Sequence, residues 1–224
     1  RALLLNRNTG TVVKKDGILC KSPASFFGEI PAVIMQPADL EIVRGAPENR
    51  RRYLDELLCF KNVRNADLLR RYRRILAERN QWLKLNKIGK AVGGEELHSV
   101  LTQQLMDLGV KIWMERMALV QEISPLIVRY YEMLAGIGDE VAVSYKSAVF
   151  DFLREKELSE EILRDAFAHK LEVLDFSERM QGLTLSGPHK DDLLLSLHGH
   201  EMRSSGSQGQ CRSAAIALRL SASD

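Results

Sequence analysis

The sequence has 224 residues, of which 45% are apolar and 28% are charged, and its formal net charge is +2. This composition describes a globular chain long enough for one large or two small hydrophobic cores. No apolar run reaches the length of a membrane span and no signal peptide is recognisable, so we expect neither a membrane protein nor a secreted one. Three distant cysteines, Cys20, Cys59 and Cys211, match no zinc-site spacing and suit the reducing cytoplasm.

The charge is distributed unevenly along the chain. Between Arg44 and Lys90 there are 14 lysines and arginines against 5 aspartates and glutamates, a local net charge of +9, while the rest of the chain carries −7. A basic block of this kind favours a polyphosphate partner such as nucleic acid.

Residues 1–36 show the alternation and the turn residues that are typical of short strands. We expect strands near residues 2–5, 11–13 and 32–35, with Pro37 ending this segment. The beginning of the chain is therefore predicted to be a small piece of β-sheet.

Three helices are predicted in the middle of the chain, and the last two of them are long. Apolar side chains recur at helical spacing in residues 50–60 and 66–85, and again from 95 to about 134 with a bend at Pro125. Glycines at 89–94 mark a chain reversal between the second and third of these segments. Long helices that meet at a glycine turn predict an antiparallel helical arm.

The last third of the chain mixes both kinds of element. We expect a strand near residues 141–145, then a helix that Ser159 caps and that ends near residue 180. Strands are expected near residues 183–185 and 193–197, followed by a helix that begins at Ser207.

A polar turn opens this final helix. Ser207-Gln208-Gly209-Gln210 precedes a run of alanine, isoleucine and leucine, the layout of the signature loop by which ABC-type ATPases contact nucleotide. A hydroxyl group, a glycine and unpaired backbone N–H groups at a helix start attract an anion, because the helix dipole points its positive end at the ligand. The turn would supply half of an ATPase site.

The other half of such a site is missing from this sequence. The Walker A pattern G-x-x-x-x-G-K-[ST] does not occur, since the one Gly-Lys pair, at 89–90, lacks its required neighbours. No apolar strand ends in the paired acids of a Walker B motif, so we expect no catalytic residue, no metal site and no ATP hydrolysis in this chain alone. Because the chain begins at Arg1 rather than methionine, we expect it to be part of a longer protein.

Four motifs together carry a resemblance to a known family. In chain order they are Pro37-Ala38-Asp39-Leu40-Glu41-Ile42-Val43-Arg44-Gly45, Arg50-Arg51-Arg52-Tyr53-Leu54-Asp55, Gly187-Pro188-His189-Lys190-Asp191-Asp192-Leu193 and Ser207-Gln208-Gly209-Gln210. Each motif alone is modest, but the set in this order resembles the RecF family of bacterial recombination mediators. The resemblance covers essentially the whole chain.

The resemblance implies an α+β fold that is predominantly α-helical. An antiparallel helical arm, residues 37–180 with a short strand near 140–147, would be inserted into a partial ATPase head of the ABC/SMC type. Residues 1–36 and 181–224 would be the two portions of that head, with short β-strands and the signature loop. The Walker A and Walker B segments would lie before and after this chain.

The resemblance also implies a function in DNA replication, recombination, repair and the SOS response. The complete protein would be a cytoplasmic, ATP-dependent dimer that binds single-stranded or gapped DNA and helps to load recombinase. Its cofactors would be ATP and Mg²⁺ in the full-length dimer, and none is expected in this part alone. Its partners would be DNA, a second copy of itself and other recombination mediators, with no membrane.

Individual site residues follow from the same resemblance. Ser207 corresponds to the signature serine that bonds the γ-phosphate of ATP held by the opposite subunit, with Gln208, Gly209 and Gln210 in the remaining signature positions. Gln36 resembles the Q-loop glutamine of related ATPases, which senses Mg²⁺ and the attacking water. The sequence departs from the family pattern on either side of the signature, at Ser205-Gly206 and at Cys211, which bears on the stiffness of the loop.

The arginines leave two interpretations open. Arg50 and Arg51 are candidates for DNA contact, but they and Arg52 point in different directions around a helix and cannot all face one phosphate track. The alternative is that they pair with nearby acids, namely Asp39, Glu41 and Asp55. Arg70 and Arg74 are also DNA-contact candidates because they share a helix face, although a solvated surface is the more common explanation for such a pair.

Two other groups have a structural interpretation. His189 beside Lys190 and two aspartates resembles a catalytic cluster, but a hydrogen-bonded loop that supports the signature region fits better than a metal site. Five aromatic side chains lie at helical spacing among aliphatic ones and are expected to pack in the core rather than stack on bases. They are Tyr72, Trp82, Trp113, Tyr130 and Tyr131.

Two further hypotheses about function remain beside the leading one. The chain could be a non-enzymatic helical arm that binds DNA or partner proteins through its basic face. It could also be part of a different SMC-like ATPase or of an OLD-type nuclease, although an arm of only about two long helices favours a short-armed protein.

Overall fold

The computed structural model describes residues 2–6, 10–15, 18–19, 36–136, 138–150 and 159–222. The chain divides into two compact units, one of residues 1–34 with 223–224 and one of residues 35–222. The smaller unit contains an antiparallel sheet of β1 (Ala2–Asn6), β2 (Gly10–Lys15) and β3 (Ile18–Leu19), in that order. The strands expected near 2–5 and 11–13 are confirmed, and the one expected near 32–35 lies outside the described residues.

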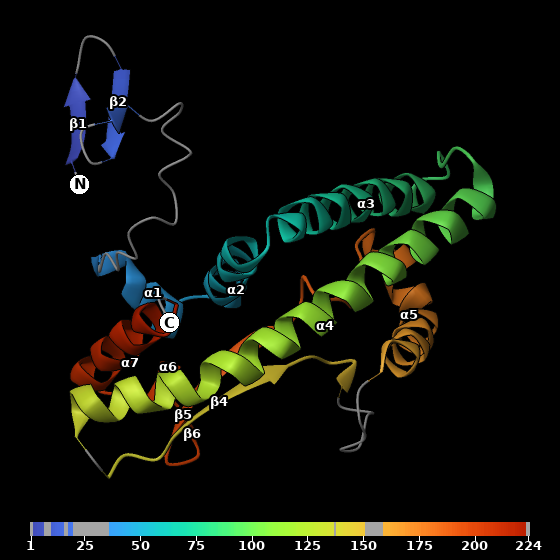
Figure 1. The fold of residues 1–224 in the computed structure, drawn as a ribbon. Coiled ribbons are helices and arrows are strands. Elements are labelled where there is room, and N and C mark those ends of the chain that lie inside the picture. The colour runs from blue at the N-terminus through green and yellow to red at the C-terminus, as the bar shows by residue number, and fades with distance from the viewer. Residues whose placement is uncertain are drawn as a thin grey trace. The chain divides into compact units, whose positions relative to one another are not determined.

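The larger unit is mostly helical (Figure 1). Its elements are, in chain order, η2 (Pro37–Asp39), α1 (Leu40–Arg44), α2 (Pro47–Lys61), α3 (Val63–Lys87), α4 (Gly94–Ala135), β4 (Val141–Lys146), α5 (Glu160–Gln181), β5 (Asp192–Leu197), β6 (His200–Glu201), α6 (Met202–Ser205) and α7 (Gln208–Leu220). The predominantly helical α+β class expected from the sequence is therefore confirmed. The expected division into residues 1–36, 37–180 and 181–224 stays a prediction.

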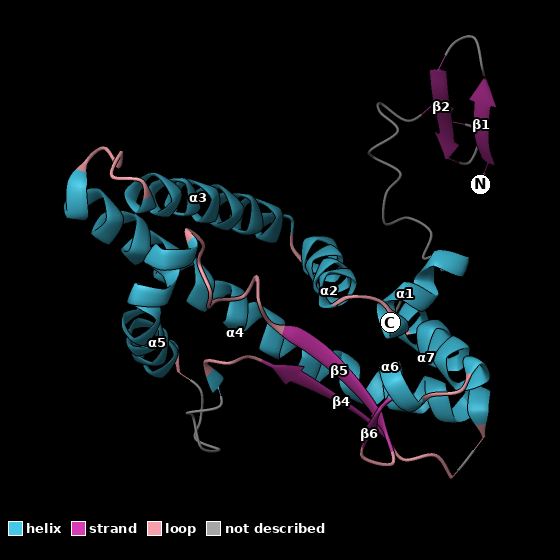
Figure 2. Ribbon diagram, turned by 180° about the vertical axis from the view of Figure 1, so that it is seen from behind, coloured by secondary structure: helices cyan, strands magenta, loops and turns pink. Residues whose placement is uncertain are grey.

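The predicted pair of long helices is present as α3 and α4, which lie side by side (Figures 1 and 2). Asn62 caps α3, because its side-chain oxygen accepts a hydrogen bond from the backbone N–H of Arg64 at 3.0 Å. Gly93 and Gly94 reverse the chain before α4 with φ angles of 81° and 58°, a left-handed conformation that favours glycine. Helix α4 has 42 residues in all and continues past Pro125, so the bend expected there does not end the helix.

A second antiparallel sheet, in the order β4-β5-β6, lies along the C-terminal half of α4 (Figure 2). Its central strand β5 pairs Leu193 with Tyr145 and Leu195 with Val143 of β4. Leu193 and Leu195 are buried against the helices, because alternate residues of a strand face the same side. The strands expected near 141–145 and 193–197 are thus confirmed.

The strand expected near residues 183–185 is wrong, because this segment is a loop between α5 and β5. Side chains bond its backbone in place of a neighbouring strand. The N–H of Thr184 donates to Oδ1 of Asn80, and the N–H of Leu185 donates to Oε1 of Glu178, both at 2.7 Å.

Helix α6 has only four residues, too few to show a periodicity that a sequence could reveal.

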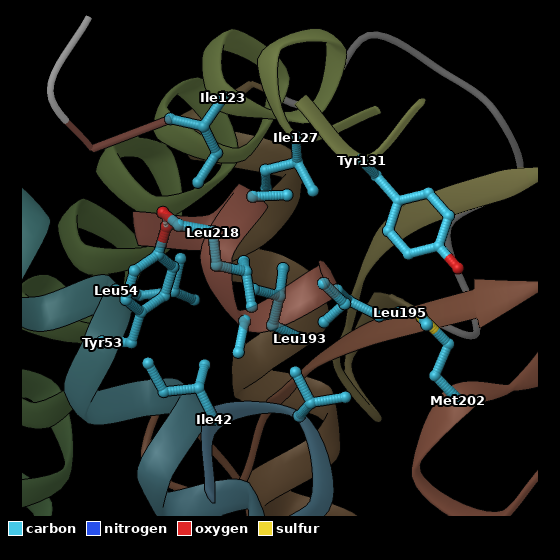
Figure 3. Packing of buried hydrophobic residues seen from close by; sticks show 14 of the residues in the cluster. Ile42, Tyr53, Leu54, Ile123, Ile127, Tyr131, Leu193, Leu195, Met202 and Leu218 are labelled. Carbon is cyan, nitrogen blue, oxygen red and sulfur yellow. Dashed lines mark hydrogen bonds between the residues drawn. The ribbon is translucent and has the colours of Figure 1, made fainter. Parts of the chain in front are cut away.

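Two hydrophobic clusters hold the larger unit together. The first joins α1, α2, the C-terminal part of α4, the sheet and α7 through residues such as Leu54 and Leu218 (Figure 3). The second lies between α3, α4 and α5 around Trp113, whose ring packs edge-on against Phe167. The aromatic side chains expected in the core are indeed buried, with Tyr130 only partly so; they are Tyr72, Trp82, Trp113 and Tyr131.

The segment from Gly187 to Asp192 is a tightly hydrogen-bonded loop. Gly187 has a φ of 130°, and a Cβ atom there would lie 2.7 Å from Oη of Tyr72, so only glycine fits. Tyr72 Oη lies 2.7 Å from Nδ1 of His189, whose Nε2 is 3.2 Å from the carbonyl oxygen of Thr184. Burial lowers the pKa of His189 to about 4, so the ring is neutral near pH 7, with its proton on Nε2 and directed at the carbonyl.

The two aspartates of this loop are bonded by different elements. Oδ2 of Asp191 accepts hydrogen bonds from Nε1 of Trp113 at 2.5 Å and from Oη of Tyr145 at 2.7 Å. Asp192 forms two hydrogen bonds with Arg50 of α2, at 2.6 and 2.9 Å. Because a carboxylate removed from water is stable only with such partners, these contacts fix the loop to α2, α4 and β4.

A buried ion pair fastens α3 to α5. Arg79 is 1% exposed and Glu178 is 0% exposed, with Nη2 and Oε2 2.7 Å apart. Arg79 also donates hydrogen bonds to the hydroxyl groups of Thr102 in α4 and Thr184 in the loop, at 3.0 and 2.8 Å. One guanidinium group therefore connects four segments of the chain.

We expect the substitution Arg79→Met to lower the free energy of unfolding by about 3–5 kcal/mol, because it leaves the Glu178 carboxylate buried without its partner. The matched control is Arg74→Gln, which removes an exposed pair with Glu78 and should leave the free energy of unfolding nearly unchanged. Urea unfolding followed by circular dichroism measures both. Equal, small losses in the two variants would contradict the assignment.

Candidate functional site

The turn that begins α7 is closed by a reciprocal pair of hydrogen bonds. Oγ of Ser207 accepts from the backbone N–H of Gln210 at 3.2 Å, and Oε1 of Gln210 accepts from the backbone N–H of Ser207 at 2.9 Å. This capping box fixes the shape of the turn. Ser207, Gln208 and Gly209 are exposed to solvent.

The same turn has the properties of an anion site. The N–H groups of Gln208 and Gly209 lie in the first turn of α7, where a helix offers no carbonyl oxygen to receive them. The hydroxyl hydrogen of Ser207 is free to donate, because its oxygen serves as the acceptor in the cap. Three donors at the positive end of a helix dipole suit a phosphate oxygen.

Two glycines of this region differ in what they contact. A Cβ atom at Gly206 would lie 2.7 Å from the carbonyl oxygen of Met202 and 2.9 Å from Sγ of Cys211, so internal packing requires glycine there. A Cβ atom at Gly209 would meet no heavy atom within 4 Å. Since glycine destabilises a helix by about 1 kcal/mol relative to alanine, the fold itself does not account for Gly209.

An arginine from α1 supports the loop before Ser207. Nη2 of Arg44 donates to the carbonyl oxygen of Gly206 at 3.0 Å, and Nε of Arg44 lies 3.3 Å from Sγ of Cys211. Cys211 is a buried free thiol. Gly206 and Cys211, which depart from the family pattern, therefore take part in holding the loop. Arg44 belongs to the first motif, but no sequence signal links it to Gly206, 162 residues away.

Gln36 lies near the other end of α7. Its side chain is exposed, and its backbone N–H donates to Oδ2 of Asp39 at 2.7 Å. Oδ1 of Asp39 accepts from Nε and Nη2 of Arg219, in the last turn of α7, at 3.0 and 2.5 Å. Because α7 has 13 residues and a helix rises about 1.5 Å per residue, Gln36 and Ser207 are separated by roughly 20 Å within one chain.

The ionisation of Asp39 follows from these bonds. Burial by itself raises the pKa of the carboxyl group, but the hydrogen bonds from Arg219 and Gln36 and the charge of Arg219 outweigh burial. The pKa therefore lies below its ordinary value, and the group is a carboxylate at physiological pH.

Arg50 does not lie at the surface, which corrects its place among the DNA-contact candidates. It is 3% exposed and pairs with Asp192, while its Nη1 donates to the carbonyl oxygen of Gly45 at 2.9 Å. The pairing interpretation is the right one for Arg50, although its partner is none of the acids expected from the sequence. Arg51 is half-buried and donates from Nη1 to the carbonyl oxygen of Asp191 at 2.7 Å.

The arginines in the first half of α3 do lie at the surface. Arg70 and Arg74 are exposed on one face and pair with acids of the same helix, Asp67 at 2.5 Å and Glu78 at 2.8 Å. Exposed arginines also stand at positions 64 and 71. We call this set, Arg64, Arg70, Arg71 and Arg74, the basic face of α3.

The acids near these arginines have other partners than expected. Asp55 pairs with Arg73 at 2.9 Å and with the buried Arg116 at 2.7 Å. Among the described residues, histidine, cysteine and acidic side chains form no group of three that would hold a metal ion. Within the same part of the chain, no helix is long and apolar enough to cross a membrane.

Comparison with known proteins places this arrangement in context. The chain is 33% identical over 214 residues to the DNA replication and repair protein RecF of Chlorobium luteolum, an alignment that covers 96% of this chain and 57% of that protein. It is 34% identical over 198 residues to the protein of the same name from Geobacter metallireducens, covering 88% and 51% of the two chains. No family model matches the sequence.

Solved structures show the same fold. The structure described as the recombination mediator protein RecF-ATPrS in the RecFOR pathway superposes with a TM-score of 0.78 at 25% identity and covers 98% of this chain and 57% of that one. A second structure, described as RecF-ATP in the same pathway, gives a TM-score of 0.77 at 27% identity, covering 95% of this chain and 55% of that one. The chain thus spans little more than half the length of the proteins it matches. Sequence and fold together identify it as a relative of the RecF proteins along nearly its whole length.

Proposed function

We propose that this chain is the part of an ATP-dependent DNA repair and recombination protein that presents Ser207 to nucleotide bound by a second copy of the protein. The observation that carries the proposal is the exposed, capped turn of Ser207 to Gln210, with open space around Gly209. Because no side chain fills this space, a molecule from outside the chain can approach the turn closely. The solved relatives described with ATP support the choice of nucleotide.

The residues of the turn would have different roles in binding a phosphate. The Ser207 hydroxyl and the N–H groups of Gln208 and Gly209 would hold the terminal phosphate oxygens. Gln210 would keep Ser207 in place through the capping box. ATP supplies the phosphoryl group and brings Mg²⁺ with it, while Gln36, some 20 Å along α7 from the turn, would serve the nucleotide of its own subunit.

The second part of the proposal concerns DNA. The basic face of α3 is exposed and carries four arginines, which suits phosphates of single-stranded or gapped DNA. In a cytoplasmic repair protein, this surface would hold DNA while other recombination mediators act on it. The same observation supports the alternative function, a non-enzymatic arm that binds DNA without any role for the Ser207 turn.

We expect Ser207→Arg to abolish ATP-driven dimerisation of the complete protein while each subunit still binds ATP, because the long cation fills the phosphate position from the opposite side. Ser159→Arg is the matched control, since Ser159 caps α5 in the same way and lies away from the turn. Each variant should lose about 1 kcal/mol of stability with its cap. Sedimentation with ATP measures the association, and unchanged dimerisation of Ser207→Arg would refute the site.

A substitution at Gly209 should have opposite effects on stability and on function. Gly209→Ala should raise the free energy of unfolding by about 0.5–1 kcal/mol, because alanine favours the helix and meets nothing inside the chain. It should nevertheless weaken ATP-driven dimerisation, because the methyl group stands where the second copy approaches. A variant that is more stable and dimerises as well as the parent would argue against the open space as a contact.

We expect Arg70→Gln with Arg74→Gln to weaken binding to single-stranded DNA and to reduce the salt slope of log affinity by about 1.4, roughly 0.7 for each lost phosphate contact. The control pair is Lys111→Gln with Arg129→Gln, which removes the same charge from exposed positions of α4. Fluorescence anisotropy at several salt concentrations measures both. Equal slopes in the two double variants would show that net charge, rather than this face, binds DNA.

A further inference from the structure

A cavity of about 340 Å³ opens between α2, α3, α4 and the loop that begins at Gly187. Four arginines line it against two acidic side chains, and His189, which also lines it, is neutral near pH 7. The charged lining residues are Glu48, Arg51, Arg52, Asp55, Arg73 and Arg116. Their net charge is +2, and we call this space the arginine cavity.

The arginine cavity has a closed inner side and an open outer side. Tyr72 and Arg116, which line the inner side, are each 3% exposed. Arg52 and Arg73, which line the rim, have side chains that are 68% and 66% exposed. A continuous DNA strand lies along a surface, whereas a concave space with one opening encloses a small group that a single bond joins to the rest of its molecule.

The positive charge of the cavity is only partly neutralised from within the chain. Asp55 pairs with Arg73 at 2.9 Å and with Arg116 at 2.7 Å, so one carboxylate serves two guanidinium groups. Nε of Arg116 is buried, and among the described residues it has no hydrogen-bond partner. Since buried donors are normally paired, this one indicates that the chain does not supply every acceptor that its cations can use.

Arg51 adds a charge that has no acidic partner in the part of the chain that the structure describes. Its Nη1 donates to the carbonyl oxygen of Asp191 at 2.7 Å, which fixes the half-buried side chain at the cavity. A guanidinium group has five N–H donors, so most of them remain for a ligand with several acceptor oxygens. Phosphate is such a ligand, because its oxygens accept N–H groups of arginine in pairs.

We propose that the arginine cavity binds a phosphomonoester, the phosphate group at the end of a DNA strand or of a free nucleotide, at a site separate from the Ser207 turn. Such a group carries about 1.5 to 2 negative charges at pH 7, which complements a lining of charge +2. A phosphate inside a strand carries a single charge and is joined to its chain on two sides. Where the phosphate belongs to DNA, the inference rests on the proposed DNA binding; where it belongs to a nucleotide, it does not.

The experiment uses single-stranded oligonucleotides of one sequence that carry a phosphate at the 5′ end, at the 3′ end or at neither end. Fluorescence anisotropy measures their binding to the complete, nucleotide-free protein. We expect a phosphate at one of the ends to tighten binding about tenfold, the effect of one or two charge-assisted hydrogen bonds. Arg73→Gln should remove most of this preference without unfolding the protein, because Asp55 keeps its pair with Arg116. Arg52→Gln, at the same rim, should act likewise.

Arg71→Gln is the matched control, because Arg71 is an exposed arginine of α3 that does not line the cavity. Since Arg71 belongs to the basic face of α3, its loss should weaken the binding of all three strands by the same factor and leave the phosphate preference unchanged. A preference that Arg71→Gln lowers as much as Arg73→Gln does would be a general effect of charge and would overturn the site.

Titration with thymidine 5′-monophosphate tests the cavity without DNA, so it decides the inference even if the proposed DNA binding fails. Calorimetry should show a binding event that Arg73→Gln weakens about tenfold and Arg71→Gln leaves unchanged. If the three strands bind alike, this result assigns the cavity to a free nucleotide. Equal nucleotide binding by the parent and Arg73→Gln, with no preference among the strands, overturns the inference. An aspartate tetrapeptide that displaces the nucleotide at equal concentration would also overturn it, in favour of an acidic protein segment.

Discussion

The ion pair between Arg50 and Asp192 is the constraint on which the rest of the larger unit depends. Asp192 ends the Gly187 loop and begins β5, while Arg50 lies in α2, 142 residues earlier. Arginine and aspartate withdrawn from water are stable only in contact with each other, so α2 and β5 have one permitted alignment. Asp191, bonded to Trp113 and Tyr145, adds α4 and β4 to the same junction. Leu193, next to Asp192, belongs to the first hydrophobic cluster, and Trp113 belongs to the second.

The contrast between buried and exposed polar groups indicates where the molecule acts. The charged groups of the junction are paired within the chain. By contrast, Ser207, Gln208 and Gly209, at the start of α7, present hydrogen-bond donors to solvent. The turn gains its rigidity from two neighbours, the exposed Arg44, which bonds the carbonyl oxygen of Gly206, and the buried thiol of Cys211. A preformed turn loses little entropy when an anion binds.

Local patterns in the sequence predict local structure, and they fail where side chains distant in the sequence determine the conformation. The helix start expected at Ser207 is such a local feature, since the capping box that forms it joins two residues only three positions apart. The sequence of residues 183–185 predicts a strand, but the segment is a loop. The backbone N–H of Thr184 donates to Asn80, 104 residues away, rather than to a neighbouring strand. The sequence likewise does not indicate that Arg50 is buried, since the acids nearest to it in the sequence are not its partners. The same holds for the Asp39–Arg219 pair, separated by 180 residues.

Helix α4 determines how the two proposed surfaces can move. It has 42 residues, about 63 Å at 1.5 Å per residue, and it belongs to both clusters. Its middle packs against α3 around Trp113, and its C-terminal part packs against α7 around Ile123 and Ile127 (Figure 3). A hinge between the basic face of α3 and the Ser207 turn would have to expose one of these clusters or break α4, and each costs several kcal/mol. DNA held on α3 and nucleotide held at Ser207 would therefore move as parts of one rigid body, because α7 belongs to the first cluster as well.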